Sequence, residues 1–360
     1  MNKLPIRVGI IGVHPTKGWA TTAHVPALQN LPEYQITAVS HHDLPTAQAA
    51  AQNFGVPHAF ASAAELVAHP EVDLVVVAVK VPHHADLVGQ AIAAGKAVFS
   101  EWPLGTSLTQ AREMRDLAQA AGVTTSIGLQ TRAASAFAHA RLLVRDGYVG
   151  EVLSASMIGS GIIWGEAMNE GYVYTLDPAN GAAMLNVPFA HSIDGLLHVL
   201  DDSFEKVSGL LGNVRKNTRI IETGAELPMA VADQILLAGQ LSNGAAVSVH
   251  FRGGISRGTN FHVEINGTSG DLVITSPIGY VGVGGMRLQG ARGDEPLHEL
   301  EIPASYTAHG VEGPAQLVAS AYLQLAKDMV NGTRCGPNFD DAVNLHGLLE
   351  KIVLNSGALK

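Results

Sequence analysis

The run VDLVVVAV at residues 72–79 is apolar at nearly every position, and it constrains the fold more than any other stretch of the chain. A strand buried on both faces has this composition, because helices cover both sides of a parallel sheet. Similar strand-like runs occur at 6–12, 34–40, 96–101 and 123–129, separated by helix-favouring segments such as TAQAAAQNF and HADLVGQAIAAG. The first third of the chain therefore predicts a doubly wound parallel sheet.

The pattern changes after about residue 150. Two segments, 232–254 and 262–276, place Asn-Gly or glycine-rich turns between strand-like runs, which predicts antiparallel hairpins. Two late segments, 314–330 and 340–356, have helical apolar spacing. We expect two domains: residues 1–130 with the parallel sheet, and residues 131–360 as an α+β domain with an open, largely antiparallel sheet. The last helices could pack back on the first domain.

Composition narrows the range of partners. The chain has 360 residues, 47% hydrophobic and 15% charged, which is enough for two separate cores. Its formal charge of -10 repels nucleic-acid phosphates, so we expect no direct nucleic-acid partner. Cys335, the single cysteine, cannot form an internal disulfide. Pro5 and Arg7 interrupt the apolar start, and no apolar run reaches membrane-spanning length, so we expect a cytoplasmic protein without a membrane partner.

The first predicted strand runs into the loop GVHPTKG at residues 12–18. A buried strand, a glycine turn and a helix N-terminus together hold a pyrophosphate in dinucleotide-binding folds. The usual G-x-G-x-x-G pattern is altered, because His14 replaces the middle glycine and Gly18 comes one residue late. The alternative is a plain strand-to-helix turn. The predicted cofactor-binding residues of this loop are Gly12, His14, Thr16, Lys17, Gly18 and Trp19.

The second predicted strand ends at Ser40-His41-His42. An NAD-selective fold usually has an acidic residue here, which binds the ribose 2'-hydroxyl. A hydroxyl and imidazoles in place of a carboxylate leave room for a 2'-phosphate, so Ser40 and His41 favour NADP over NAD. Asp43 could still reach the ribose, and the two histidines could instead simply cap an exposed strand end.

Six segments in order resemble the glucose-fructose oxidoreductase/inositol dehydrogenase (Gfo/Idh/MocA) family. They are GIIGVHPTKGWATTAHVPAL, VVVAVKVPHHADL, GKAVFSEWPLG, GLQTRAASAFAHARLLVRDGYVGEV, NVPFAHSIDGLLHVL and VEINGTSGDLVI. The resemblance implies an N-terminal Rossmann domain, NAD(P) as cofactor and a small sugar-like substrate. In this family the antiparallel sheet usually supplies the oligomer interface, so a homodimer or homotetramer is expected.

Finer features are similar to the subgroup that contains the fungal repressor of galactose metabolism. These features are the longer glycine loop followed by KGWA, the Glu101-Trp102 pair, the LQ-x-R segment, Trp164-Gly165 and the tyrosines at 172 and 174. That relative binds a dinucleotide as a sensor and is not known for turnover. The subgroup therefore implies an alternative function, a non-catalytic dinucleotide or sugar sensor with a regulatory protein partner.

Two proton-handling positions of the family are altered. The family's Glu-Lys-Pro reads Glu101-Trp102-Pro103, and an indole does not exchange a proton as a lysine does. The family's Asp-x-x-x-His places its histidine at His191, but Val187 stands where the aspartate belongs. Both changes bear on whether the protein turns over a substrate.

The resemblance assigns the other candidate site residues. His191 and Tyr174 are the candidate catalytic residues. Additional cofactor contacts are expected at Lys80, His84, Glu101, Trp102 and Gln130, and substrate contacts at Trp102, Arg132, Trp164, Tyr172 and His191. His191, Asp194 and His198 share one helical face, which would suit a metal, but such side chains more often bond to their neighbours. We predict no metal.

These residues predict an NAD(P)-dependent oxidoreductase that transfers a hydride at a secondary alcohol of a sugar or sugar derivative. The sensor is the main alternative. A minor alternative is an NAD-dependent glycosidase, which oxidises a sugar transiently to permit elimination.

Overall fold

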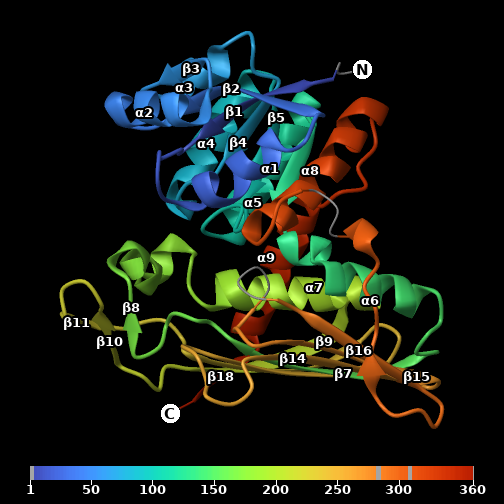
Figure 1. Ribbon diagram of the computed structural model, residues 1–360. Coiled ribbons are helices and arrows are strands. Elements are labelled where there is room, and N and C mark those ends of the chain that lie inside the picture. Colours follow the sequence, from blue (N-terminus) through green and yellow to red (C-terminus); the bar gives the residue numbers. More distant parts are fainter. Residues whose placement is uncertain (1–3, 281–284, 307–309, 360) are drawn as a thin grey trace. The chain divides into compact units, whose positions relative to one another are not determined.

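The computed structural model describes residues 4–280, 285–306 and 310–359 (Figure 1). The chain divides into two compact units. The first comprises residues 1–129 with 307–346, and the second comprises residues 130–306 with 347–360. No helix in the described part of the chain combines the length and the apolar character needed to cross a membrane.

The described residues of the first unit form a six-stranded parallel sheet in the order β3-β2-β1-β4-β5-β6. Its strands are β1 (Ile6–Ile11), β2 (Tyr34–Ser40), β3 (His58–Phe60), β4 (Leu74–Val77), β5 (Ala97–Glu101) and β6 (Thr125–Gly128). The predicted doubly wound parallel sheet is confirmed. The strand at 72–79 is shorter than its apolar run, and β3 was not predicted because three residues carry too little periodicity to detect.

Helices connect these strands, as the alternating sequence pattern predicts. They are α1 (Val25–Gln29) with the π-helical turn Ala20–His24 before it, α2 (Leu44–Phe54), α3 (Ala63–Ala68), α4 (His84–Ala93) and α5 (Leu108–Ala121). Side chains of β1 alternate between two cores. Ile6 and Val8 join the cluster with α1 and α8, while a Cβ on Gly9 would lie 2.6 Å from Leu66 on α3.

Two late helices follow, α8 (Pro314–Asn331) and α9 (Phe339–Leu354), drawn in red tones in Figure 1. The first of them packs in the core of the first unit. Tyr322 on α8 is fully buried, and its carbonyl accepts a hydrogen bond of 2.7 Å from the Tyr34 hydroxyl on β2. Burial of a full tyrosine ring contributes about 2 to 3 kcal/mol, which explains why a segment so distant in sequence belongs to this core.

The second unit contains a nine-stranded sheet in the order β17-β16-β15-β14-β7-β13-β12-β9-β18. Its strands are β7 (Val152–Ser160), β9 (Phe204–Gly212), β12 (Gln234–Leu241), β13 (Ala246–Arg252), β14 (Phe261–Gly267), β15 (Gly270–Ser276), β16 (Arg287–Arg292), β17 (His298–Glu299) and β18 (Ser356–Leu359). Only β7 with β13 and β9 with β18 pair in parallel, so the predicted largely antiparallel sheet is confirmed. The predicted hairpins are β12–β13 and β14–β15.

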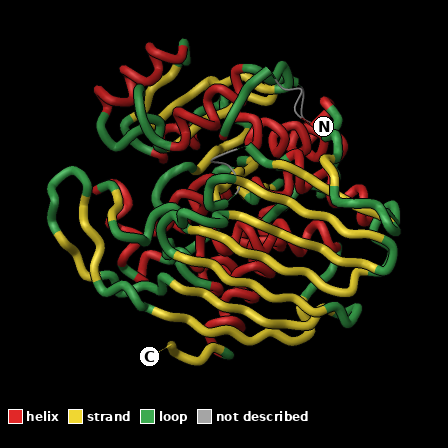
Figure 2. The backbone as a smooth tube through the Cα atoms, turned by 60° about the horizontal axis from the view of Figure 1, so that its bottom comes forward, coloured by secondary structure: helices red, strands yellow, loops and turns green. Residues whose placement is uncertain are grey.

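Helices α6 (Ser135–Arg145) and α7 (Ala190–Leu200) cover one face of this sheet (Figure 1). Among the described residues, no helix covers the opposite face (Figure 2), where Ile158 and Leu210 are exposed. A smaller sheet in the order β11-β10-β8 joins β8 (Ala167–Met168), β10 (Asn217–Ile220) and β11 (Glu226–Pro228). Short helical turns lie at Val81–His83, Gln130–Ala133, Glu170–Leu176, Pro178–Asn180, Leu185–Phe189 and Ala304–Tyr306.

Candidate functional site

Several predicted cofactor residues lie where strands of the parallel sheet end. Gly12 directly follows β1, Ser40 closes β2, Lys80 follows β4 and Glu101 closes β5. Parallel strands all end at the same edge of a sheet, so these residues share one edge. The strand order reverses between β1 and β4, and that position is where doubly wound folds bind their ligands.

Gly12 makes the turn that no larger residue could make without strain. Its φ is +94°, and a Cβ at this position would lie 2.5 Å from Val79 Cγ1. The amides of Gly12 and Val13 both donate to the Ser40 carbonyl, at 2.9 and 3.2 Å. The buried Ser40 thus fixes the loop through its backbone.

His14 turns its ring back into the loop. Its Nδ1 accepts the amide N–H of Thr16 at 3.2 Å, and its carbonyl accepts the Thr21 hydroxyl. The Thr16 amide is therefore already used inside the loop in this conformation, while Lys17 and Trp19 are exposed. Gly18 has a φ of +94° with open space around it, directly before the helix that begins with the turn Ala20–His24.

Three imidazoles gather at the end of β2. The rings of His41 and His42 lie 4.2 Å apart between centroids, and His14 lies 6.2 Å from His41. Burial lowers the pKa of His41, and the neighbouring charges of His42 and His14 lower it further. The side chain of Asp43 is held at the start of the next helix, α2. Its carboxylate accepts the Thr46 amide at 3.0 Å as the N-cap of α2, and hydrogen bonds from Thr46 lower the pKa of Asp43.

A chain of buried polar groups leads to Glu101. The Tyr322 hydroxyl lies 2.7 Å from His24 Nδ1, and His24 Nε2 lies 3.0 Å from Glu101 Oε1. Burial raises the pKa of Tyr322 well above its usual value, so the phenol stays protonated and can donate a hydrogen bond to Nδ1. His24 Nε2 faces the Glu101 carboxylate at ion-pair distance. His24 was not among the residues predicted from the sequence, although a histidine within an apolar helix is a signal for a buried polar contact.

Trp102, which replaces the family lysine, is buried in the packing of the first unit. Only 5% of it is exposed, and its ring lies 4.5 Å from that of His346 on α9 at an angle of 44°. Burial lowers the pKa of His346 to about 4. One face of the indole is thus already covered, and the predicted role of Trp102 as a sugar-stacking wall stays a prediction.

His84 is also buried. Its Nδ1 lies 2.9 Å from the Pro103 carbonyl and its Nε2 lies 3.0 Å from the Val79 carbonyl, so the ring ties the loops after β4 and β5 together. Burial lowers the pKa of His84. A neutral imidazole carries one N–H, so His84 donates to one of these carbonyls and lies beside the other, and its cofactor contact stays a prediction.

The second unit holds the remaining candidates. His191 lies on α7, and its ring is nearly parallel to that of Tyr280, with centroids 6.5 Å apart. Burial raises the pKa of Tyr280 to about 12, with a smaller contribution from Tyr172, so these phenols lie in one neighbourhood. Burial also raises the pKa of Tyr174, while Tyr172 is exposed. Tyr280 was not among the residues predicted from the sequence, because nothing in its spacing links it to His191.

Arg132, predicted to bind substrate, forms an ion pair with Asp194, and its substrate contact stays a prediction. Its Nε and Nη2 donate to the two carboxylate oxygens of Asp194 at 2.9 and 2.7 Å, in a pair whose side chains are 19% and 6% exposed. Both oxygens of Asp194 thus accept hydrogen bonds from Arg132. Gln130 is buried in the same helical turn as Arg132.

Trp164 presents an unpaired donor. The residue has a φ of +60° and only 3% of it is exposed. Its indole Nε1 has no hydrogen-bond partner within the described parts of the chain. A buried donor without a partner is uncommon in folded proteins and is a position where a ligand atom can bind.

Comparisons with known proteins agree with this geometry. Residues 6–129 match the model of the oxidoreductase family with an NAD-binding Rossmann fold, and residues 136–276 match the Gal80p C-terminal domain. The chain is 30% identical to the galactose/lactose metabolism regulatory protein GAL80 of Saccharomyces cerevisiae, over 80% of this chain and 70% of that protein. It is 32% identical to dehydrogenase aclE of Aspergillus oryzae, over 55% of each. The structure of a super-repressor mutant of Gal80p from Saccharomyces cerevisiae aligns with a TM-score of 0.88 at 26% identity, covering 98% of this chain and 96% of that one.

The fold and the site define a protein of the NAD-binding Rossmann oxidoreductase class. The chain belongs to the Gfo/Idh/MocA family, and its C-terminal half is of the Gal80p type. The family predicted from the sequence motifs is thereby confirmed.

Proposed function

We propose that this protein is an NAD(P)-dependent oxidoreductase that transfers a hydride at a secondary alcohol of a sugar or sugar derivative. The observation that carries the proposal is the pairing of His191 with Tyr280, since it keeps a proton-exchanging imidazole beside phenols after the family lysine and aspartate are lost. The relationship to a dehydrogenase of Aspergillus oryzae supports the same class of activity.

The proposed roles follow from the contacts. A bound nicotinamide supplies the hydride chemistry. His191 takes the proton of the substrate hydroxyl, because an imidazole ordinarily titrates near neutral pH. Tyr280, with a pKa of about 12, stays protonated and donates a hydrogen bond to a substrate oxygen, with support from Tyr174. The indole N–H of Trp164 donates to a second substrate oxygen.

The dinucleotide is proposed to bind at the strand-end edge beside Gly12, with Lys17 near its phosphates and Glu101 near the nicotinamide end. We propose NADP in preference to NAD. Asp43 is engaged as a helix cap, and His41 and His42 stand where an NAD-selective protein would place a carboxylate.

A second candidate function is a non-catalytic dinucleotide or sugar sensor with a regulatory protein partner. Two observations favour it. Trp102 is packed against His346 where the family has a lysine, and Val187 occupies the place of the family aspartate. The similarity to the regulatory protein GAL80 points the same way.

The two functions are separated by measuring binding and turnover independently. Fluorescence titration with NADPH and NADH measures binding, and absorbance of the reduced nicotinamide measures turnover against aldoses, cyclitols and aryl glycosides. We expect saturable NADPH binding and turnover of at least one sugar. Binding without turnover would favour the sensor, and release of p-nitrophenol without net cofactor reduction would identify a glycosidase. Absence of saturable binding would overturn all three.

The role of His191 has its own test. Substitution H191Q is expected to lower kcat by about 10² to 10⁴ while leaving the affinity for NADPH unchanged. The matched control is H198Q, since His198 lies on the same helix two turns away and has no proposed catalytic role. Equal kcat for H191Q and the unmodified protein would remove His191 from the mechanism.

We further propose that the protein acts in the cytoplasm as a homodimer or homotetramer. The exposed sheet face with Ile158 and Leu210 is the proposed interface, because burying it would remove these apolar side chains from water. Light scattering of the purified chain should give the mass of a dimer or tetramer, and L210D should lower it.

A further inference from the structure

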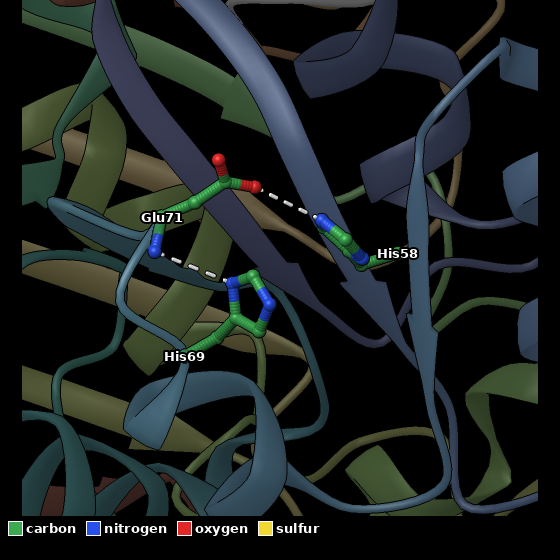
Figure 3. Close-up of side chains that lie close together, drawn as sticks. All are labelled: His58, His69 and Glu71. Atoms are coloured by element: carbon green, nitrogen blue, oxygen red, sulfur yellow. Dashed lines mark hydrogen bonds and ion pairs between the residues drawn. The ribbon is translucent and has the colours of Figure 1, made fainter.

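Two histidines and a glutamate of the first unit converge on one point (Figure 3). His58 begins β3, His69 directly follows α3, and Glu71 precedes β4. Each offers one ligand atom, and these atoms all lie within 4.8 Å of one another. We propose that His58, His69 and Glu71 bind one divalent transition-metal ion of the zinc type.

The three side chains already point toward a common centre. His58 Nε2 lies 3.0 Å from a carboxylate oxygen of Glu71, so a proton now bridges the two groups. A metal ion would take the place of that proton, since zinc ligands bind in their deprotonated forms. His69 Nδ1 accepts the Glu71 amide at 3.3 Å, and this hydrogen bond sets the orientation of the ring.

The backbone around these ligands is held firmly. The buried Thr37 hydroxyl donates to the Glu71 carbonyl at 2.6 Å, and the Lys96 ammonium donates to the His69 carbonyl at 3.2 Å. Phe60 limits the rotation of both rings, since its centroid lies 5.4 Å from that of His69 and 6.3 Å from that of His58. A metal would thus meet ligands whose main chain is fixed in advance, which reduces the entropic cost of binding.

The donor set selects the kind of ion. Two imidazole nitrogens and one carboxylate oxygen suit Zn²⁺ and its neighbours Co²⁺, Ni²⁺ and Cu²⁺, whereas Mg²⁺ and Ca²⁺ prefer oxygen alone. The side chains of His58 and Glu71 are 36% and 53% exposed, so water can complete the coordination. The bound ion would link β3 to the connection between α3 and β4. Its binding would therefore raise the stability of the first unit. The inference does not depend on the proposed function.

The test uses the untagged full chain and Zn²⁺ alone as the probe. Equilibrium dialysis should find one equivalent of Zn²⁺ bound per chain. When Co²⁺ replaces Zn²⁺, the protein should show the visible absorption bands of a Co²⁺ ion with few ligands. The double substitution H58A/H69A should abolish this binding. E71Q should weaken it at least about tenfold, and it should fold normally because Glu71 is exposed.

A matched control is available in the second unit. His262 and Glu264 form a pair at 3.4 Å with similar exposure, 31% and 42%, but this pair is not part of a three-ligand cluster among the described residues. H262A should therefore keep the full stoichiometry. Zn²⁺ should also raise the unfolding temperature of the unmodified protein and not that of H58A/H69A. Equal Zn²⁺ affinity in H58A/H69A, or no binding to the unmodified chain at millimolar Zn²⁺, would overturn the proposal.

Discussion

Arg132 binds the carboxylate of Asp194 through two hydrogen bonds, which Nε donates at 2.9 Å and Nη2 donates at 2.7 Å. The pair joins the turn Gln130–Ala133 to helix α7, which carries His191 three residues before Asp194. A guanidinium and a carboxylate match each other in this two-point geometry, which makes the pair specific as well as strong. Arg132 therefore fixes helix α7 against the turn Gln130–Ala133.

Removing the charge of Asp194 is expected to destabilise the fold. In D194N the partly buried guanidinium of Arg132 loses the charge of its buried partner, and the free energy of unfolding should fall by about 3 kcal/mol. Urea denaturation measures this change. D201N is the control, since Asp201 pairs with Arg141 at the surface and should cost less than about 1 kcal/mol. Equal losses in the two variants would contradict the structural role of the pair.

His346 should make the stability depend on pH. Its pKa is about 4 in the fold, whereas an unfolded histidine titrates near 6.5. Between these pH values the unfolded chain binds a proton that the folded chain does not, so the free energy of unfolding falls as the pH drops. The full effect is about 3 kcal/mol. H346F keeps a ring against Trp102 and should show a flatter profile in denaturant titrations from pH 7 to 4. If H346F and the unmodified protein lose stability equally as the pH falls, His346 does not contribute to the pH dependence.

Gly12 and Gly18 have the same φ of +94° but different surroundings. G12A adds a Cβ against Val79, so it suffers both backbone strain and overlap and should cost about 3 kcal/mol, with loss of NADPH binding. G18A meets open space and should cost about 1 kcal/mol from strain alone. Chemical denaturation of both variants measures the loss of stability, and titration of each variant with NADPH measures the loss of binding. Both losses should be larger in G12A than in G18A. The idea is wrong if G18A proves the more harmful of the two.

The imidazole cluster at the end of β2 should set cofactor preference. H41D introduces a carboxylate where a 2'-phosphate is proposed to lie, so NADPH affinity should fall at least about tenfold while NADH affinity stays the same or rises. Fluorescence titration with both nucleotides gives the ratio. H298D is the control, because His298 is exposed in the other unit and should leave the ratio unchanged.

The parallel sheet could be predicted because short strand-like runs alternate with helix-favouring segments, and because β4, which is buried on both faces, lies within an unbroken apolar run. The hairpins of the second unit could be predicted from turn residues between strand-like runs. By contrast, β18 is four residues long and pairs with β9, nearly 150 positions earlier in the chain, so no local pattern predicts it.

Some features of the candidate site could likewise be predicted from local sequence, and others could not. The sequence by itself determined the family, the altered glycine loop and the loss of the lysine and aspartate, because each of these is a residue at a fixed place in a local motif. Only the tertiary structure decided that Asp43 caps a helix, that Trp102 packs on His346, and that Arg132 binds Asp194. Such contacts depend on which distant segments share a core, and His24 and Tyr322 are separated by 298 positions. Short-range patterning governs strands and turns, but burial and hydrogen-bond pairing across a folded chain assign each polar side chain its partner.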